Sequence, residues 1–431
     1  MSETKVGSRY VVVLGGLLVQ ICLGSIYAWS FFQNALGKVS GVYHWPTLFT
    51  QLPFATGLAS FAFFMVIAGR WQDRAGPRKV ATVGGILLGA GYVLAWLVDA
   101  VAAGDATKGV VYLVITYGII GGAGIGFGYV CPIASLVKWF PDKKGTITGI
   151  AVAGFGAGAL IIGYAEDALL NVFQAPANLT IGVPFLILGI VYVIGVTIGA
   201  QVLKNPPPGW VCPGYTPPAT TADGKGLSIM PGQMVRTGGF WLLWLMFVLA
   251  ATAGLMVIGN IKTAAIAIDP SAAAWATLIL GVYSLCNAGG RIVWGAVSDR
   301  IGRENTMFAM FAVLAAAMFF FSYISPPSSP FFAVSWPIVM IVGAVIGFCF
   351  GGNFSLFPSS TADLYGSKNV GKNYGVVFTA YGIAGIMGGL VAGLFVQWTG
   401  SYMTAFFITG LLAVLAALLT FALKSVRKKR Q

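Results

Sequence analysis

Charged residues are scarce in this sequence: Asp, Glu, Lys and Arg together make up only 9% of its 431 residues. Hydrophobic residues make up 58% of the chain and the mean hydropathy is +0.86, so there is too little polar surface to cover a water-soluble globule. The apolar runs are continuous over about 20 residues, the length with which a helix crosses the hydrocarbon core, and this pattern excludes a membrane β-barrel. We therefore expect an all-α membrane protein that crosses the bilayer many times.

Residues that bind metals or form disulfides are also few. The sequence has one histidine and five cysteines, and no two cysteines form a CxxC pair. Four of the cysteines lie in apolar runs, where small core residues are expected, and His44 precedes such a run, where a loop residue is expected. The sequence therefore predicts no metal site and no cofactor. The net charge of +13 does not indicate a nucleic-acid partner, because the basic residues lie at the ends of the apolar runs.

Twelve apolar runs are long enough to span a membrane. They lie at residues 10–36, 47–69, 80–101, 109–137, 145–164, 179–203, 237–264, 273–297, 305–324, 332–361, 370–397 and 402–423. Because the number is even, both termini fall on the same side. Of the 25 Lys and Arg residues, 21 lie on that side and three, Lys38, Lys108 and Lys262, lie on the other. The positive-inside rule then predicts cytoplasmic termini and a multi-pass protein of the inner (plasma) membrane.

A longer polar segment divides the chain. Residues 204–236 are rich in Pro, Gly and Thr, and we predict a central cytoplasmic loop there, between an N-terminal six-helix bundle at 1–203 and a C-terminal six-helix bundle at 237–431. Each half carries the pattern G-x-x-x-D-R-x-G after its second span, at 69–76 and at 295–302, 226 residues apart. Four positions that match in register at equivalent points indicate an internal duplication.

Arg291 differs from the other charged residues. Among the 37 Lys, Arg, Asp and Glu residues it alone is expected well inside an apolar run, and no acid is expected deep in a span. An arginine at the middle of a membrane helix costs roughly 2.5–3.5 kcal/mol on insertion scales, so a function with an anionic partner is expected. The structural alternative is that its side chain snorkels to the cytoplasmic interface, roughly 9 Å away along the helix.

Two neighbours of Arg291 share its helix face. Tyr283, Asn287 and Arg291 are spaced by four residues, which places them on one side of a helix. The fixed fork of a guanidinium suits a planar carboxylate in bidentate geometry, and a lysine would suit it less well. This face is therefore the candidate binding site for a small carboxylate, with a helix-to-helix hydrogen bond as the alternative role of Asn287.

The repeated turn, the twelve spans and the central loop together resemble the major facilitator superfamily over nearly the whole chain. The resemblance implies the two-bundle fold of that family and a transport function. It also implies that the repeated turn is a conformational latch, in which Asp73, Arg74, Asp299 and Arg300 pair with neighbouring helix ends in the outward-facing state. An ordinary charged turn is the alternative.

Shorter motifs indicate a branch of that superfamily. They are GIGFGY at 124–129, WFPDKKG at 139–145, AGFGAG at 153–158, NAGGR at 287–291 and KNYG at 372–375. Together they resemble the oxalate:formate antiporter group and its relatives, the monocarboxylate transporters. The resemblance implies that Arg291 binds the substrate carboxylate and that Tyr27 and Tyr129 place hydroxyls toward the cavity, with Tyr381 covering the rest of a small anion. Packing or an interfacial position is the alternative for each tyrosine.

Two departures from this branch concern the substrate and the proton. Oxalate antiporters carry a second cation, a lysine, at the position of Tyr381, so a dianion would face one positive charge instead of two, which favours a monocarboxylate. Many monocarboxylate transporters carry an aspartate at the position of Asn287, and an amide cannot take its proton. Asp269, just past the outer end of the seventh span, is the remaining candidate for proton coupling, and a plain loop acid is the alternative.

These observations predict a secondary active transporter of small monocarboxylates such as lactate or pyruvate, coupled to protons and working by alternating access. Its expected partners are the small monocarboxylate anion, protons and the lipid bilayer, with a single chain as the working unit. The alternatives are an oxalate/formate-type organic anion exchanger, in which Lys262 or Lys372 supplies the second cation, and a membrane sensor without flux. An enzyme is not expected, because no segment between the spans is large enough for a catalytic domain.

Overall fold

The computed structural model describes residues 9–37, 43–173, 180–207, 210–212, 214, 228–325, 335–399 and 402–428. Within these ranges every regular element is a helix, and no strand occurs. In chain order the elements are α1 (Arg9–Leu23), η1 (Gly24–Ala28), α2 (Ser30–Gly37), α3 (Thr47–Ala75), α4 (Pro77–Ala95), α5 (Val98–Ala102), α6 (Ala106–Leu113), η2 (Val114–Gly121), α7 (Gly122–Trp139), α8 (Lys144–Phe173), α9 (Gly182–Gln201), α10 (Pro231–Met234), α11 (Gly238–Ile268), η3 (Pro270–Trp275), α12 (Ala276–Ile301), α13 (Arg303–Ile324), α14 (Trp336–Tyr365), α15 (Val370–Val377), α16 (Thr379–Thr399) and α17 (Met403–Lys428).

The predicted spans coincide with these helices. Eleven stretches of the described residues are long and apolar enough to cross a membrane. The predicted span at 370–397 corresponds to α15 and α16, which are separated by the single residue Phe378. The all-α membrane fold is therefore confirmed, whereas the count of twelve spans stays a prediction.

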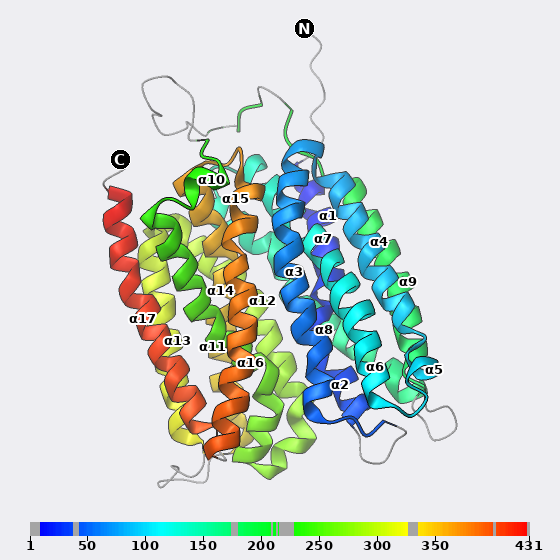
Figure 1. The fold of residues 1–431 in the computed structure, drawn as a ribbon. Coiled ribbons are helices and arrows are strands. Elements are labelled where there is room, and N and C mark those ends of the chain that lie inside the picture. Colours follow the sequence, from blue (N-terminus) through cyan, green and yellow to red (C-terminus); the bar gives the residue numbers. More distant parts are fainter. Residues whose placement is uncertain are drawn as a thin grey trace.

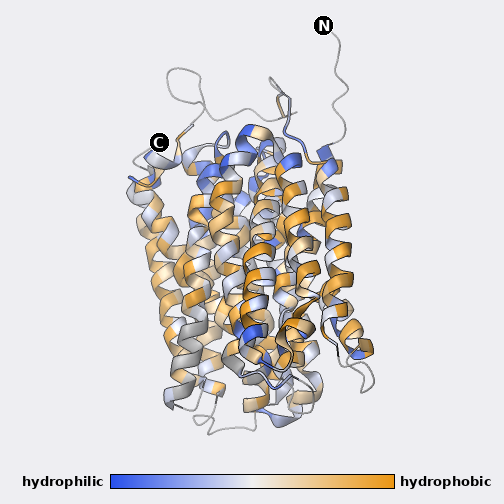
Figure 2. Cartoon of the chain, turned by 45° about the vertical axis from the view of Figure 1, so that its right-hand side comes forward, coloured by the Kyte–Doolittle hydropathy of each residue, from blue (hydrophilic) through white to orange (hydrophobic). Residues whose placement is uncertain are grey.

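The outer surface of the helix assembly is apolar. Large hydrophobic side chains are exposed along it, among them Phe63, Ile86, Ile190, Leu411 and Phe421. Figure 2 shows hydrophobic residues along most of the helix lengths and hydrophilic residues gathered at the end where α1 begins and α17 finishes. Such a belt of apolar side chains suits contact with lipid tails. The helices also satisfy their backbone hydrogen bonds internally, as the bilayer core requires.

Helices of the two halves of the chain occupy opposite sides of the molecule (Figure 1). The first residue of α1 and the last of α17 lie at the same end. Across the boundary, α8 packs against α12 and α14, and α3 packs against α15 and α16. The α8–α12 contact requires glycine: a Cβ on Gly149 would collide with the backbone carbonyl of Arg291. This close approach places Arg291 at the boundary between the halves.

Two of the spans are interrupted by short segments that are not α-helical. The 3₁₀ segment η1 separates α1 from α2 and carries Ser25 and Tyr27, and the π-helical segment η2 separates α6 from α7 and carries Tyr117. Gly24 at the start of η1 lies directly against the backbone of Phe155 in α8. Such interruptions frequently mark functional positions, because they redirect side chains out of the regular helical pattern.

One predicted boundary is wrong, and it changes the pattern of charge inside the fold. The sequence places the end of the fifth span at residue 164, before the adjacent acids Glu166 and Asp167, whereas α8 continues to Phe173. Glu166 is fully buried in this extension, while Asp167 stays partly exposed. The expectation that Arg291 alone lies inside a span, and that no acid does, is therefore incorrect. Two adjacent acids resemble a loop in the sequence, but the tertiary fold buries one and leaves the other near the surface.

Candidate functional site

Arg291 of α12 is fully buried at the boundary between the halves. Its Nε donates to Oδ1 of Asn287, one turn earlier, at 3.0 Å, and its Nη1 donates to the backbone carbonyl of Val152 in α8 at 2.7 Å. Nη2 has no partner of hydrogen-bonding geometry among the described residues. None of the ion pairs among the described residues includes Arg291. The side chain therefore neither reaches the interface nor pairs with an acid of these residues.

Two aromatic rings flank the guanidinium. The Arg291 Cζ atom lies 4.3 Å from the ring centroid of Phe354 in α14 and 5.5 Å from that of Phe155 in α8. Cation–π contact stabilises the charge in part and keeps the planar group oriented. All of these partners are neutral, so no described group compensates the positive charge, and Nη2 keeps the capacity to donate to an anion.

The predicted tyrosines Tyr27, Tyr129 and Tyr381 gather around the same aromatic side chains. Phe155 lies edge-on against Tyr27 at 5.1 Å and against Tyr129 at 5.2 Å, measured between ring centroids. Tyr381 of α16 lies 5.5 Å from Phe354. The hydroxyls of Tyr27 and Tyr381 are 2.6 Å apart and form a hydrogen bond between η1 and α16, whereas the buried Tyr129 hydroxyl has no partner of hydrogen-bonding geometry.

The other two predicted neighbours of Arg291 have different environments. Asn287 holds the Arg291 Nε through its amide oxygen, while its Nδ2 has no partner. Tyr283 donates its hydroxyl to the carbonyl of Gly254 in α11 at 3.0 Å. Asn287 therefore orients the guanidinium, and the Tyr283 hydroxyl is already engaged. Direct contact of either residue with a ligand stays a prediction.

Three neighbours of this site are absent from the sequence-based selection. Val152 supplies a backbone carbonyl, Phe155 supplies a ring, and Tyr374 of α15 supplies a second buried hydroxyl without a partner. A backbone carbonyl leaves no signal in the sequence. Phe155 and Tyr374 lie inside the motifs AGFGAG and KNYG, but with aromatic residues at 13% of the chain neither differs from a packing residue until its neighbours are known.

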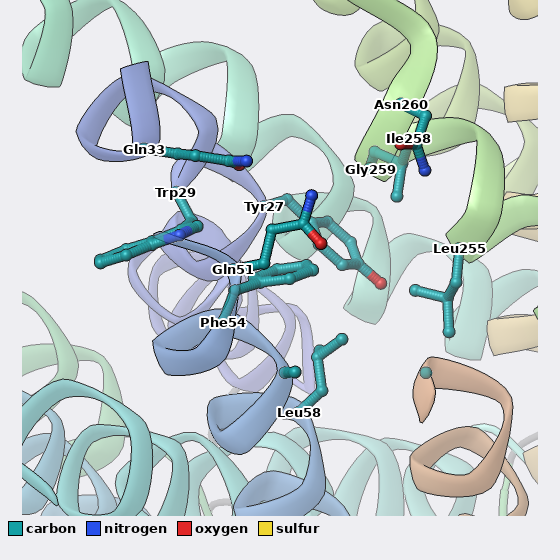
Figure 3. Close-up of a pocket in the computed structure, with 12 residues that line it drawn as sticks. Tyr27, Trp29, Gln33, Gln51, Phe54, Leu58, Leu255, Ile258, Gly259 and Asn260 are labelled. Carbon is teal, nitrogen blue, oxygen red and sulfur yellow. The ribbon is translucent and has the colours of Figure 1, made fainter. Parts of the chain in front are cut away.

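A cavity approaches this site from the end of the molecule opposite to the start of α1. Its volume is about 80 Å³. It is lined by Tyr27, Trp29, Gln33, Gln51, Phe54, Ala55, Leu58, Leu255, Ile258, Gly259, Asn260 and Gly385, which come from both halves. Figure 3 shows the amide groups of Gln33, Gln51 and Asn260 around the open space and the Tyr27 ring at its side. Tyr27 lines the cavity and also lies close to Arg291, so the bonded pair of Tyr27 and Tyr381 stands between the cavity and the guanidinium.

At the end where α1 begins, the acids of the repeated turn join the two halves. Asp299, at the end of α12, accepts hydrogen bonds from the backbone N–H groups of Gly145 and Thr146 at 2.9 and 2.7 Å, and from the Thr146 hydroxyl at 2.7 Å. Asp73, at the end of α3, accepts from the backbone N–H of Lys372 at 2.9 Å. Each acid thus binds the first turn of a helix in the opposite half, α8 or α15, where free N–H groups and the helix dipole favour a negative charge.

The basic residues that pair with these acids lie outside the repeated motif. Arg303 pairs with Asp299 at 2.6 Å and with Asp363 at 2.9 Å. Lys144 pairs with Asp363 at 2.9 Å, and Lys138 pairs with Asp73 at 3.2 Å.

The predicted latch arginines Arg74 and Arg300 are both exposed. Neither has an ion pair to a described residue. Their share in a latch stays a prediction.

Asp269 lies between α11 and η3, outside the membrane-spanning helices. It caps η3 by accepting hydrogen bonds from the Ser271 hydroxyl at 2.7 Å and from the Ser271 N–H at 2.9 Å, and it accepts another from the Trp336 N–H at 2.8 Å. These bonds, led by the Ser271 hydroxyl, hold the pKa of the Asp269 carboxyl below its ordinary value. A carboxyl that stays ionised at neutral pH is poorly suited to carry a proton, so its contacts favour the loop-acid alternative.

The chain is similar to known transporters over nearly its full length. The family model of the Major Facilitator Superfamily matches residues 17–335 and 243–431. The chain is 30% identical over 424 residues to the oxalate:formate antiporter of Oxalobacter formigenes, which covers 98% of this chain and 93% of that protein. It is 25% identical over 452 residues to the apicoplast pyruvate carrier 1 of Toxoplasma gondii, which covers 85% and 80%, respectively.

A solved structure has the same fold. The proton:xylose symporter XylE, bound to 6-bromo-6-deoxy-D-glucose, superimposes with a TM-score of 0.66 at 15% identity, over 96% of this chain and 95% of that one. The predicted resemblance to the oxalate:formate antiporter branch is confirmed by the sequence match. The chain belongs to the Major Facilitator Superfamily and is a multi-pass membrane transporter rather than an enzyme.

Proposed function

We propose that this protein is a secondary active transporter of small monocarboxylates, such as lactate or pyruvate, coupled to protons and working by alternating access. The observation that carries the proposal is the state of Arg291: a fully buried cation with no acid partner among the described residues and with Nη2 unpaired. A carboxylate matches a guanidinium in charge and in planar geometry. The named activities of the relatives, oxalate:formate exchange and pyruvate transport, concern the same class of anion.

The choice of one carboxylate over two rests on the groups near Arg291. The position at which oxalate antiporters carry a lysine is Tyr381, which is buried and bonded to Tyr27. A tyrosine donates a hydrogen bond but does not neutralise a second carboxylate, and a desolvated carboxylate without a counter-charge costs several kcal/mol. The hydroxyls of Tyr129 and Tyr374 are buried close to each other and to Arg291, and we expect them to turn toward the keto or hydroxyl oxygen of a small acid.

Alternating access completes the proposal. The two halves at 1–203 and 237–431 move against each other around Arg291. The central loop expected at 204–236 lies partly outside the described residues. The protein lies in the inner (plasma) membrane. The end at which Asp73 and Asp299 join the halves faces the cytoplasm, and the cavity at Tyr27 opens to the outside. A bound anion offsets the charge of Arg291 and lowers the cost of closing an apolar site around it, so the loaded carrier changes conformation more readily than the empty one.

Uptake into proteoliposomes tests the site. We expect Arg291→Ala to lower monocarboxylate uptake by about 100-fold or more, because losing a desolvated charged partner costs roughly 3–5 kcal/mol. Arg291→Lys should be intermediate, since it keeps the charge and loses the fork. The matched control is Arg78→Ala, which removes an exposed arginine of α4. Uptake by Arg291→Ala at the wild-type rate would overturn the assignment.

An oxalate/formate-type exchanger is the second candidate, because a relative with that name is 30% identical over 98% of the chain. In that case Lys262 of α11 is the second cation to consider. Its Nζ lies 4.4 Å from the ring centroid of Phe31 in α2, across the boundary between the halves. A substrate panel of lactate, pyruvate, acetate, formate and oxalate separates the two. Oxalate that stimulates efflux from the opposite side, where lactate does not, would favour the exchanger.

A further inference from the structure

Glu166 is a buried acid to which the transport cycle above assigns no role. Its side chain has no exposed area, and neither carboxyl oxygen has a hydrogen-bond partner in the part of the chain that the structure describes. No ion pair among the residues of the described ranges includes it. An ionised carboxylate without a partner is strongly unfavourable in an apolar interior, so such a group takes up a proton instead. The surroundings of Glu166 therefore fit a neutral carboxylic acid.

The titratable groups that face Glu166 are hydroxyls. Tyr92 of α4, Tyr117 of η2 and Tyr192 of α9 lie within electrostatic reach of its carboxyl group. The rings of Tyr117 and Tyr192 lie 5.2 and 4.9 Å from that of Tyr92. Within the described ranges, the hydroxyls of Tyr117 and Tyr192 have no partner of hydrogen-bonding geometry. The thiol of Cys22 in α1 lies beside Tyr192. The cluster thus offers donors to a carboxylate without a permanent counter-charge.

This cluster also contacts the segment that carries Tyr27. The Tyr92 hydroxyl donates to Oγ of Ser25 in η1 at 3.4 Å. Two residues further along η1, the Tyr27 hydroxyl bonds to Tyr381 at 2.6 Å. The short segment η1 therefore connects two contacts: at Ser25 it contacts the tyrosine cluster around Glu166, and at Tyr27 it forms the hydrogen bond to the other half of the chain.

We infer that Glu166 is the proton-binding residue of the carrier, neutral in the conformation described above and ionised in a conformation in which water reaches it. The inference rests on the proposed proton-coupled transport and supplies the acid that the Arg291 site lacks, where Asn287 stands. On release, the O–H bond of the carboxyl group breaks and the proton passes to water. The carboxylate left behind accepts hydrogen bonds from the tyrosine hydroxyls of the cluster, and this reorientation displaces Ser25 and, through η1, Tyr27.

The variant that tests this inference is Glu166→Gln, which keeps the size and neutrality of the acid but cannot release a proton. In proteoliposomes with a pH difference of one unit, one proton per anion sustains about tenfold accumulation of lactate. We expect Glu166→Gln to lose this accumulation and to keep lactate counterflow at equal pH, which needs no net proton movement. Asp167→Asn is the matched control, because it removes the neighbouring, partly exposed acid and should accumulate as wild type. Full accumulation by Glu166→Gln, or equal loss in both variants, would overturn the inference.

A second measurement detects the proton on the wild-type protein directly. The infrared spectrum at neutral pH should contain the C=O stretch of a protonated carboxylic acid, shifted in heavy water, and Glu166→Asp should shift the band. If lactate uptake is present and this band is missing, the inference fails while the proposed function stands. If the band is present but no monocarboxylate is moved, the proposed substrate fails while Glu166 remains a proton-binding residue.

Discussion

Two buried arginines of this protein have opposite environments. Arg303 is paired with both Asp299 and Asp363 at the joined end of the molecule, where its charge links helices. Arg291 has only an amide oxygen, a backbone carbonyl and two ring faces as partners. Neutral partners stabilise a buried charge only in part, and an anion that binds beside it supplies the missing counter-charge. The difference between the two arginines is therefore the residue-scale argument for a ligand at Arg291.

Asn287→Asp tests this argument at the same scale. The new carboxylate would stand where Oδ1 of Asn287 accepts from Arg291 Nε, so it would neutralise the guanidinium from within. We expect anion uptake at neutral pH to fall about tenfold or more. A buried ion pair that competes with the substrate contributes at least about 1.4 kcal/mol, which corresponds to a factor of ten in binding. The ion pair with Arg291 should favour the ionised form of the introduced carboxyl group, so the loss should persist as the pH falls to 5. Uptake kinetics measured from pH 5 to 8 check this, and an unchanged KM would contradict it.

At the scale of elements, the bond between Tyr27 and Tyr381 joins η1 to α16 across the halves, next to the cavity. A single neutral hydrogen bond contributes about 0.5–1.5 kcal/mol. Its loss should therefore change the ratio of open to closed cavity by a factor of about 2 to 10. The pair is in a position to separate the cavity from Arg291, and its removal should favour the open state.

Tyr27→Phe is the variant for this prediction, with Tyr283→Phe as the matched control. The control removes a buried tyrosine hydroxyl bonded at 3.0 Å to Gly254, within one half of the chain. A cysteine at Leu58, which lines the cavity, reports opening through its rate of reaction with a membrane-impermeant thiol reagent. We expect a rate about 2 to 10 times higher in Tyr27→Phe than in the control, and equal rates would speak against a gate.

The sequence predicts those elements whose signal is local and misses those set by tertiary contacts. The span boundaries follow from apolar length, and α14 at Trp336–Tyr365 lies within a few residues of the expected 332–361. The extension of α8 through Glu166 and the interruptions at η1 and η2 have no such signal, because the packing of neighbouring helices decides them. Arg291 was predictable because a lone charge in an apolar run is rare.

At the scale of the whole molecule, the internal duplication has a structural counterpart. The acid of each repeated turn binds the first turn of a helix in the other half: Asp299 binds α8, and Asp73 binds α15. The two contacts lie at the end where α1 begins and α17 finishes (Figure 1). The cavity, lined by Gln33, Gln51 and Asn260 among others, lies toward the other end. Two equivalent contacts close one end of the boundary while the other end keeps a hollow, which is the asymmetry that alternating access requires.

Asp299→Asn and Asp73→Asn test this closure. Hydrogen bonds to a charged group contribute about 1.5–3 kcal/mol each, and Asp299 accepts three from α8, whereas Asp73 accepts one from α15. We therefore expect both variants to open the joined end, Asp299→Asn more strongly, with Arg78→Ala as the control at an exposed position.

The reporter for this opening is a cysteine at Thr148, a buried residue of α8 whose hydroxyl lies 3.5 Å from that of Ser359 in α14, across the boundary. Its reaction rate with a polar thiol reagent, applied from the side of the joined end, should rise about tenfold or more in Asp299→Asn, since losing one charge-assisted bond already corresponds to a factor of that size. The rise should be smaller in Asp73→Asn and absent in Arg78→Ala. Should Asp73→Asn open this end as strongly as Asp299→Asn, the number of capping bonds would not determine the closure.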